Sequence, residues 1–407
     1  MGPTPVNSGD TAWVLSATAL VLFMTLPGLA LFYAGLVRMK NVLSVMTHCV
    51  AIACLGSVLW LALGYSLAFE GTGPLIGGLG KAFLLSVGRG AQVGSIPETA
   101  FFMFQATFAV ITPALIVGAY VERMKFAAVL AFSGLWLLLV YAPVTHWVWG
   151  GGWLAQRHVM DFAGGLVVHA TAGASALVAA IMVGSRDGFP KMQHPPHNPG
   201  MTMTGAGMLW VGWYGFNGGS ALAANGDAAM ALLVTHMSAA TAGLVWALLE
   251  RVRFGRSSMV GLVTGVVAGL ATITPASGYV GPLGGLILGA AGSVICFVAV
   301  DVVKHRLKID DSLDVFAVHG VGGILGSLLV AVLAAKALGG TGYAAGMTMA
   351  SQAGVQVLGV VTVVVWSVLA SFAILWAVKR VIGLRAGDLA VEDGLDVSEH
   401  GERAYPA

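Results

Sequence analysis

Apolar runs of about 20 residues recur along this chain, and each is long enough to cross the hydrocarbon core of a membrane as a helix. Of the 407 residues, 57% are hydrophobic and only 9% are charged. The pattern predicts an all-α polytopic membrane protein with eleven transmembrane helices. The predicted spans are Trp13–Val37, Val42–Phe69, Phe101–Val121, Phe126–Pro143, Phe162–Val183, Met201–Leu222, Ala228–Leu249, Met259–Pro275, Val280–Val303, Val315–Ala335 and Val355–Val378.

The basic residues between these spans predict the orientation. Sixteen Lys and Arg residues fall on the face that carries the C-terminus, and four fall on the opposite face, namely Lys81, Arg89, Arg157 and Lys336. Because cytoplasmic loops are enriched in Lys and Arg, the N-terminus is expected outside and the C-terminus in the cytoplasm. Residues 1–380 then form one transmembrane domain, and residues 381–407 form a cytoplasmic tail.

Charge and cysteine usage narrow the possible functions. The net charge of +2 is small and spread over the loops, so nucleic-acid binding is not expected. Cys49, Cys54 and Cys296 all fall inside predicted spans, which implies neither a disulfide framework nor a CxxC metal site. No metal and no cofactor are predicted.

Two histidines stand at matching places in the apolar pattern. Val168 and His169 are followed four residues later by Gly173, and Val318 and His319 by Gly323. The 150 residues between the histidines hold five spans, and an odd number of spans makes the two copies enter the membrane from opposite faces. This predicts an inverted repeat of spans 1–5 and 6–10, an arrangement that places substrate sites near the midplane.

Helix geometry predicts that the two histidines meet. At 1.5 Å per residue, His169 lies roughly 12 Å below the outer end of span five, and His319 roughly 10 Å above the inner end of span ten. Since the core is about 30 Å thick, both approach its middle. A neutral imidazole pair could guide a small polar guest, or it could simply join two helices by a hydrogen bond. An axial haem pair is a third interpretation, whereas His48 and His236 have no such partner and are interpreted as packing residues.

Further motifs resemble the Amt/Mep/Rh ammonium transporter family, in particular its bacterial AmtB type. The similarity extends over nearly the whole chain in order and spacing. It is carried by residues 161–177 (DFAGGLVVHATAGASAL) with 184–186 (GSR), 104–108 (FQATF), 146–152 (HWVWGGG), 212–220 (GWYGFNGGS), 314–320 (DVFAVHG) and 394–405 (GLDVSEHGERAY).

The resemblance implies an outer vestibule in which Phe108, Trp149 and Ser220 bind an ammonium ion. Aromatic faces attract compact cations, and the Ser220 hydroxyl can accept a hydrogen bond, which potassium cannot donate. Phe216 and Phe108 resemble the stacked phenyl gate below that vestibule. Because a dry gate opposes a bare cation, the substrate is expected to be deprotonated and to pass as ammonia. The histidine pair or a separate water path would carry the proton, which would make transport electrogenic.

Asp161 and Asp314 precede the two histidine-bearing spans. The Asp161 carboxylate can accept N–H groups of Ala163 or Gly164 and cap span five, either as an anchor of the vestibule or with a direct role toward the substrate. By the repeat, Asp314 is expected to cap span ten from the inside.

The resemblance also implies the setting in which the protein works. It implies a homotrimer in the lipid of the cell inner membrane, with a PII-type signalling protein of the GlnK kind binding the tail and the inner pore mouth. Trp149 and Ser220 favour the Amt branch over the Rh branch. A sensor that binds ammonium and signals through the tail is the alternative to a transporter.

Overall fold

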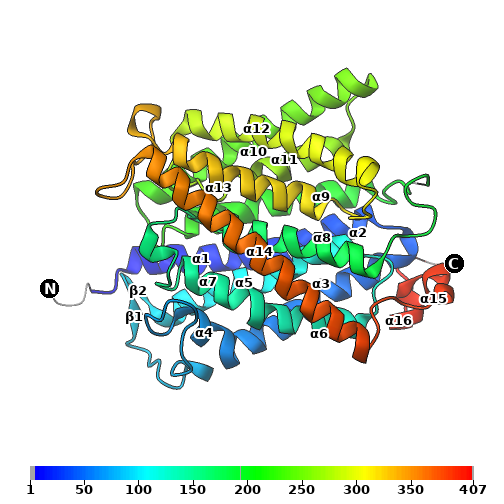
Figure 1. The fold of residues 1–407 in the computed structure, drawn as a ribbon, viewed down its shortest axis with the longest axis horizontal. Coiled ribbons are helices and arrows are strands. Elements are labelled where there is room, and N and C mark those ends of the chain that lie inside the picture. Colours follow the sequence, from blue (N-terminus) through cyan, green and yellow to red (C-terminus); the bar gives the residue numbers. More distant parts are fainter. Residues whose placement is uncertain (1–4, 193, 406–407) are drawn as a thin grey trace.

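The computed structural model describes residues 5–192 and 194–405, and every predicted span is helical in it (Figure 1). Nine helices in these residues are long and apolar enough to cross a membrane, and the helix that begins at Met259 is apolar but shorter. The nine are Ser8–Leu36, Met39–Phe69, Glu98–Tyr120, Phe126–Val148, Gly165–Val183, Gly226–Phe254, Pro282–Arg306, Phe316–Leu333 and Met349–Val381. The fold is therefore that of a polytopic helical membrane protein, and eleven crossings with the stated orientation remain a prediction.

Several of these long helices are divided by π-helical or 3-10 turns, so that they comprise more than one element. The first half of the chain contains α1 (Ser8–Phe23), η1 (Met24–Leu29), α2 (Ala30–Leu36), η2 (Met39–Asn41), α3 (Val42–Leu59), η3 (Trp60–Gly64), α4 (Tyr65–Phe69), α5 (Glu98–Tyr120), α6 (Phe126–Trp136), η5 (Leu137–Tyr141), α7 (Ala142–Val148), η7 (Gly165–Ala170) and α8 (Thr171–Val183). The second half contains α9 (Pro199–Trp213), η8 (Tyr214–Gly218), α10 (Gly226–Phe254), α11 (Met259–Ile273), α12 (Pro282–Asp301), η9 (Val302–Arg306), η10 (Phe316–Gly320), α13 (Val321–Leu333) and α14 (Met349–Val381).

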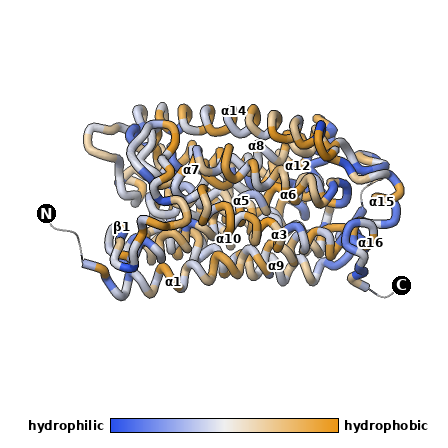
Figure 2. The backbone as a smooth tube through the Cα atoms, turned by 90° about the horizontal axis from the view of Figure 1, so that it is seen from below, coloured by the Kyte–Doolittle hydropathy of each residue, from blue (hydrophilic) through white to orange (hydrophobic). Residues whose placement is uncertain are grey.

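Short elements cover the two ends of the bundle. At one end lie η4 (Ala82–Leu84), η6 (Ala155–Arg157), η11 (Lys336–Leu338) and a small antiparallel hairpin of β1 (Gln92–Val93) and β2 (Ile96–Pro97). The tail helices α15 (Asp388–Asp393) and α16 (Leu395–His400) lie at the other end, opposite the start of α1 (Figure 1). Figure 2 shows hydrophobic residues along the helices and hydrophilic residues gathered toward these ends, as expected for a membrane protein.

Burial separates central helices from peripheral ones. In α5, 94% of the apolar stretch is buried, against 33% in α14, which runs diagonally across the bundle (Figure 1). The exposed face of α14 is itself apolar, with Val361, Val365, Leu369, Phe372 and Trp376 on it. A helix that is apolar on its exposed face fits a lipid surface, so α14 is peripheral and α5 lies in the core of the domain.

The two histidine-bearing helices cross in a reciprocal manner. A Cβ atom on Gly173 would lie 2.2 Å from the Cα of Gly320, and one on Gly323 would lie 2.6 Å from the Cβ of His169 and 3.2 Å from the backbone nitrogen of Ala170. In each copy, the glycine four residues after the histidine therefore packs against the segment around the other histidine. Small residues allow this close approach, and the reciprocal contacts are those expected of a repeat.

Candidate functional site

Three aromatic rings from three separate segments form a continuous stack. Phe108 of α5 and Phe216 of η8 are stacked, with ring centroids 4.2 Å apart, and Trp149 at the end of α7 meets Phe108 edge to face at 5.9 Å. Phe108 and Phe216 are fully buried, whereas Trp149 is partly exposed. The stack therefore has one side facing solvent and one side closed, as expected of a vestibule above an apolar gate.

The other predicted vestibule residue, Ser220, is joined to this stack through Phe216. Its hydroxyl donates to the backbone oxygen of Phe216 at 2.8 Å, and the side chain is partly buried. Because that hydrogen is used, the lone pairs of the Ser220 oxygen are free to accept a hydrogen bond from an N–H donor.

Asp161 caps η7 with both of its carboxylate oxygens. The backbone N–H groups of Gly164 and Gly165 donate to Oδ1 at 2.9 and 2.6 Å, and those of Leu166 and Val167 donate to Oδ2 at 2.8 and 3.1 Å. Burial raises the pKa of Asp161, and these four bonds oppose that shift. The predicted capping role is confirmed, including the bond from Gly164.

Asp161 also fixes the position of Trp149. The indole N–H of Trp149 donates to the backbone oxygen of Asp161 at 2.8 Å. The residue that caps the histidine-bearing helix thus also holds the ring above the gate. This double attachment favours the anchor role of Asp161 over a direct role toward the substrate.

Next to Phe216 lies a narrow lumen of about 10 Å³, roughly the space that one water-sized molecule requires. Its walls are apolar apart from the two histidines and are formed by Met24, Leu29, Phe32, Ile111, Leu115, Val168, His169, Leu209, Trp213, Phe216, Val267 and His319. Phe216 and His319 both border the lumen, and His169 lies near both, with ring centroids 6.0 and 5.3 Å away. A guest would therefore move in single file between apolar walls.

The predicted meeting of the two histidines is confirmed. The Nδ1 atoms of His169 and His319 lie 3.3 Å apart, and both side chains are buried. Since two donors cannot share a hydrogen bond, one ring donates and the other accepts. Within the described residues, His169 Nε2 is buried without a hydrogen-bond partner, so it remains available to a guest in the lumen.

Irregular helix geometry coincides with this part of the molecule. His169, His319 and Phe216 all lie on π-helical segments, and so do Met24 and Leu29 of η1. Such segments often occur at functional sites because they re-aim side chains. Trp213, which precedes η8, stacks on His169 at 5.6 Å and was not predicted as a lumen residue. Its place three residues before Phe216 on one helix is the signal that could have identified it.

The predicted capping role of Asp314 is wrong, and Asp311 performs it instead. The N–H groups of Val315 and Phe316 donate to the two oxygens of Asp311 at 3.1 and 2.7 Å. Asp311 lies eight residues before His319, as Asp161 lies eight before His169, so exact spacing identifies the equivalent residue. Asp314 instead forms an ion pair with Lys304 at 2.7 Å.

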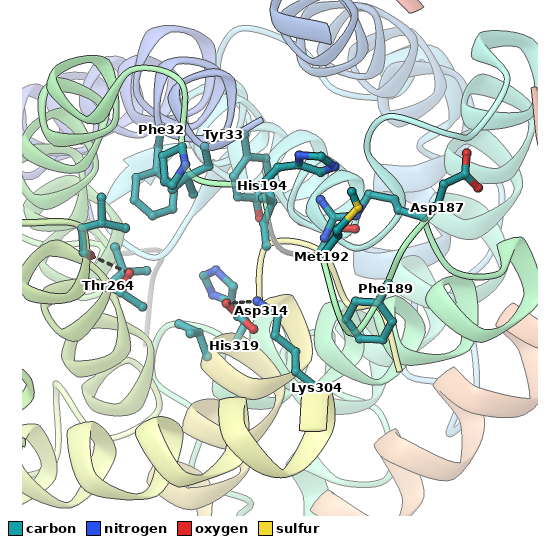
Figure 3. Close-up of a pocket in the computed structure, with 18 residues that line it drawn as sticks. Phe32, Tyr33, Asp187, Phe189, Met192, His194, Thr264, Lys304, Asp314 and His319 are labelled. Atoms are coloured by element: carbon teal, nitrogen blue, oxygen red, sulfur yellow. Dashed lines mark hydrogen bonds and ion pairs between the residues drawn. The ribbon is translucent and has the colours of Figure 1, made fainter. Parts of the chain in front are cut away.

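A second cavity, of about 230 Å³, is also lined by His319, and we call it the inner cavity because it lies toward the predicted cytoplasmic face (Figure 3). Its walls include Phe32 and Tyr33 of α2, the loop residues Phe189, Met192 and His194, and the ion pair of Lys304 with Asp314. His319 thus borders both the lumen and this inner cavity. The phenyl stack, the lumen and this cavity are therefore neighbours, since Phe216 borders the lumen and His319 borders both cavities.

The tail docks on the helix bundle through two carboxylates. Asp396 accepts the N–H groups of Leu43 and Ser44 at 3.1 and 2.6 Å, and Glu399 accepts that of Phe126 at 3.2 Å. Leu43 and Ser44 lie in the first turn of α3, and Phe126 is the first residue of α6, so residues of the tail cap two long helices.

Neither of the other two histidines in the predicted spans, His48 and His236, lines the lumen. His48 packs against Phe126 and against His400 of the tail, with ring centroids 5.8 and 6.2 Å apart. His236 is exposed and pairs with the hydroxyl of Tyr214 at 2.7 Å. His48 is therefore a buried packing residue, whereas His236 lies on the exposed face of α10.

The long apolar helices of the fold are those of a multi-pass membrane protein. Residues 12–405 match the profile of the Ammonium Transporter Family. The chain belongs to this family, and ammonium transport is the activity that the names of its relatives state.

Individual relatives agree with this assignment. The chain is 43% identical to an ammonium transporter of Aquifex aeolicus, over 98% of this chain and 94% of that one, and 42% identical to an ammonium transporter of Bacillus subtilis, over 98% and 99%. A solved structure named Sensor Amt Protein superimposes with a TM-score of 0.91 at 31% identity, covering 96% of this chain and 98% of the other.

Proposed function

We propose that this protein recruits ammonium at Phe108, Trp149 and Ser220, deprotonates it, and conducts ammonia past Phe216 and the two histidines. The observation that carries the proposal is the closed phenyl stack, 4.2 Å between centroids, above a lumen wide enough for one small molecule. A bare cation in such a lumen would lose its hydration without an equivalent replacement, which costs many kcal/mol, whereas neutral ammonia loses little.

Recruitment at the vestibule follows from the chemistry of its walls. Each aromatic face attracts a cation by about 0.5–2 kcal/mol, and the Ser220 oxygen accepts an N–H hydrogen bond. Potassium has a similar size but donates no hydrogen bond, so the acceptor favours ammonium.

The histidine pair is proposed to guide ammonia and to carry the released proton. Its two Nδ1 atoms are 3.3 Å apart, and His169 Nε2 is free to bond to a guest, so the rings form a polar line between the gate and the inner cavity. Net movement of a proton with each ammonia would make transport electrogenic.

The assembly is proposed to be a homotrimer in the lipid of the cell inner membrane, regulated by a PII-type protein of the GlnK kind. One contact supports a regulatory tail. His197 pairs with the Tyr405 hydroxyl at 3.0 Å, and the loop that carries His197 also supplies Met192 and His194 to the inner cavity. A partner that moves the tail would therefore also act on a wall of this cavity.

A sensor role is the second candidate, because one solved structure with this fold is named Sensor Amt Protein. A sensor of this kind would bind ammonium at Trp149 and signal through the docked tail. It would give no ammonium-driven current, which separates the two functions.

The test is the current triggered by ammonium, methylammonium and potassium in proteoliposomes that contain the purified protein. Wild-type protein should respond to the first two and poorly to potassium. His169→Ala and His319→Ala should lower the ammonium current or its preference over potassium, while His236→Ala, a span histidine away from the lumen, should behave as wild type. Potassium currents equal to ammonium currents in wild-type protein would refute the proposed selectivity.

A further inference from the structure

The two halves of the repeat differ at one position that bears on the inner cavity. Asp314 lies five residues before His319, and its counterpart five residues before His169 is Gly164. Both have a positive φ, 61° for Asp314 and 113° for Gly164. Glycine adopts such a backbone without strain, whereas an aspartate does so at some cost. The fold therefore needs the left-handed turn in both copies, but it does not need a carboxylate there.

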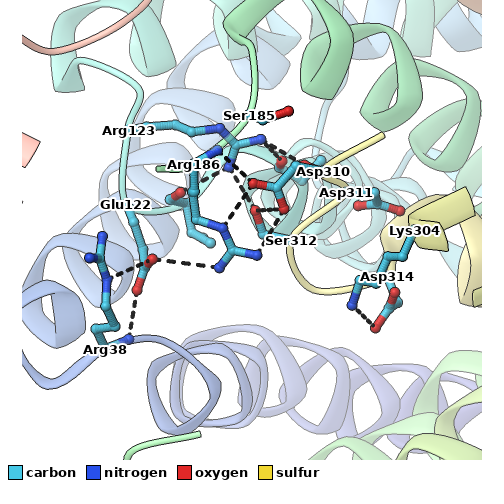
Figure 4. Close-up of polar contacts among 12 residues, drawn as sticks. Arg38, Glu122, Arg123, Ser185, Arg186, Lys304, Asp310, Asp311, Ser312 and Asp314 are labelled. Carbon is cyan, nitrogen blue, oxygen red and sulfur yellow. Dashed lines mark hydrogen bonds and ion pairs between the residues drawn. The ribbon is translucent and has the colours of Figure 1, made fainter. Parts of the chain in front are cut away.

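Local structure does not account for the carboxylate either. Asp311 already caps η10, and the nearby loops are held by a separate network in which Arg186 joins Glu122 and Asp310 (Figure 4). Figure 4 shows the pair of Lys304 and Asp314 apart from that network. Residues held in a strained backbone conformation cluster at functional sites.

The surroundings of Asp314 are those of a cation site. Its Oδ2 accepts the Lys304 ammonium at 2.7 Å, and within the described residues its Oδ1 is buried without a hydrogen-bond partner. Both side chains line the inner cavity with His319, at the end of the proposed path (Figure 3). The Lys304 side chain ends in an ammonium group, which is the same chemical group that ammonium and methylammonium present.

We propose that Asp314 is a binding residue for a small N–H cation, ammonium or methylammonium, on the inner side of the pore, and that Lys304 is its resident competitor. Exchange of the lysine for the free cation keeps the charge of the site constant, since both carry one positive charge. The 230 Å³ cavity has room for a cation that keeps part of its hydration shell. The inference rests on the proposed function, because it places a second substrate site on the same path.

The test compares half-saturating concentrations of methylammonium from each face, in right-side-out and inside-out membrane vesicles. Asp314→Gly reproduces the residue of the other repeat and should keep the fold. It should raise the half-saturating concentration measured from the inner face by about two- to five-fold, as expected for a partly exposed ion pair. Lys304→Met should lower that value, because the competitor is gone, and the double variant should resemble Asp314→Gly alone.

Arg253→Met is the matched control, since it breaks an ion pair with Asp301 that does not line the cavity. It should leave both faces unchanged. If Asp314→Gly and Lys304→Met shift the half-saturating concentration from the inner face in the same direction, or if neither shifts it, the ion pair only stabilises the structure. That result would overturn the inference. Wild-type vesicles that move no methylammonium would instead overturn the proposed function.

Discussion

Replacing Gly173 with alanine should force apart the two histidine-bearing helices. The added Cβ would lie 2.2 Å from the Cα of Gly320, whereas ordinary contacts begin at 3.4 Å, so the helices must separate by about 1.2 Å. Both sides of this contact are backbone, and no side chain can rotate away. Overpacking of this kind costs about 1–3 kcal/mol, partly offset by up to about 1 kcal/mol from the better helix propensity of alanine. The histidine pair lies one turn away, and its 3.3 Å separation would exceed hydrogen-bond length.

The assay is thermal unfolding of the purified protein together with ammonium current in proteoliposomes. Gly173→Ala should lower both the unfolding temperature and the current. Gly354→Ala on α14 is the control, because its Cβ would meet no atom within 4 Å, and it should unfold at the wild-type temperature or slightly above. Wild-type stability and current in Gly173→Ala would show that the close crossing is irrelevant to the pore.

Three further outcomes can be measured on the same preparations. Asp161→Ala should unfold at a lower temperature and lose current, since a lost cap costs about 0.5–2 kcal/mol, and Asp161→Asn should recover part of both because one acceptor oxygen remains. Burial and the nearby Asp314 raise the pKa of Asp311 from 3.8 to about 7. Between pH 4 and 7 the folded protein therefore keeps Asp311 protonated, whereas the unfolded chain loses that proton. The unfolding temperature should fall as pH rises from about 4 through about 7, and Asp311→Asn should flatten this pH dependence. Deleting residues 394–405, or replacing Asp396 with alanine, should leave an assembled protein with weaker binding of a PII-type partner, and unchanged binding and transport would exclude the tail from regulation.

The positions of the long helices were predictable from hydrophobicity, because a helix that crosses lipid needs about 20 mostly apolar residues in a row. The predicted span Phe126–Pro143 ended five residues early, since the helix continues through Pro143 to Val148 by way of a π-helical turn. Such turns leave little trace in composition, which is why the segments that aim His169 and Phe216 inward could not be foreseen.

Site residues were predictable where the residue type is rare inside an apolar span and where the two copies of the repeat have the same spacing. A histidine inside an apolar run is unusual enough to be noticed, and the 150-residue repeat predicted that His169 and His319 would meet. Trp213 was overlooked because a tryptophan in a span is commonplace. Asp314 was misread as a cap because proximity was used in place of spacing, and the spacing of eight residues points to Asp311.

The tail carboxylates have a consequence for how the protein is made. The N–H groups of Leu43 and Phe126 receive their partners from Asp396 and Glu399, which are 353 and 273 residues further along the chain. All the long helices are therefore synthesised before α3 and α6 can receive these two caps. Until the last few turns of the chain emerge, these helix ends rely on water. Synthesis interrupted between Val381 and Asp396 should thus leave a protein with all its long helices made but two of them uncapped, a defect that a protease at the membrane surface could detect.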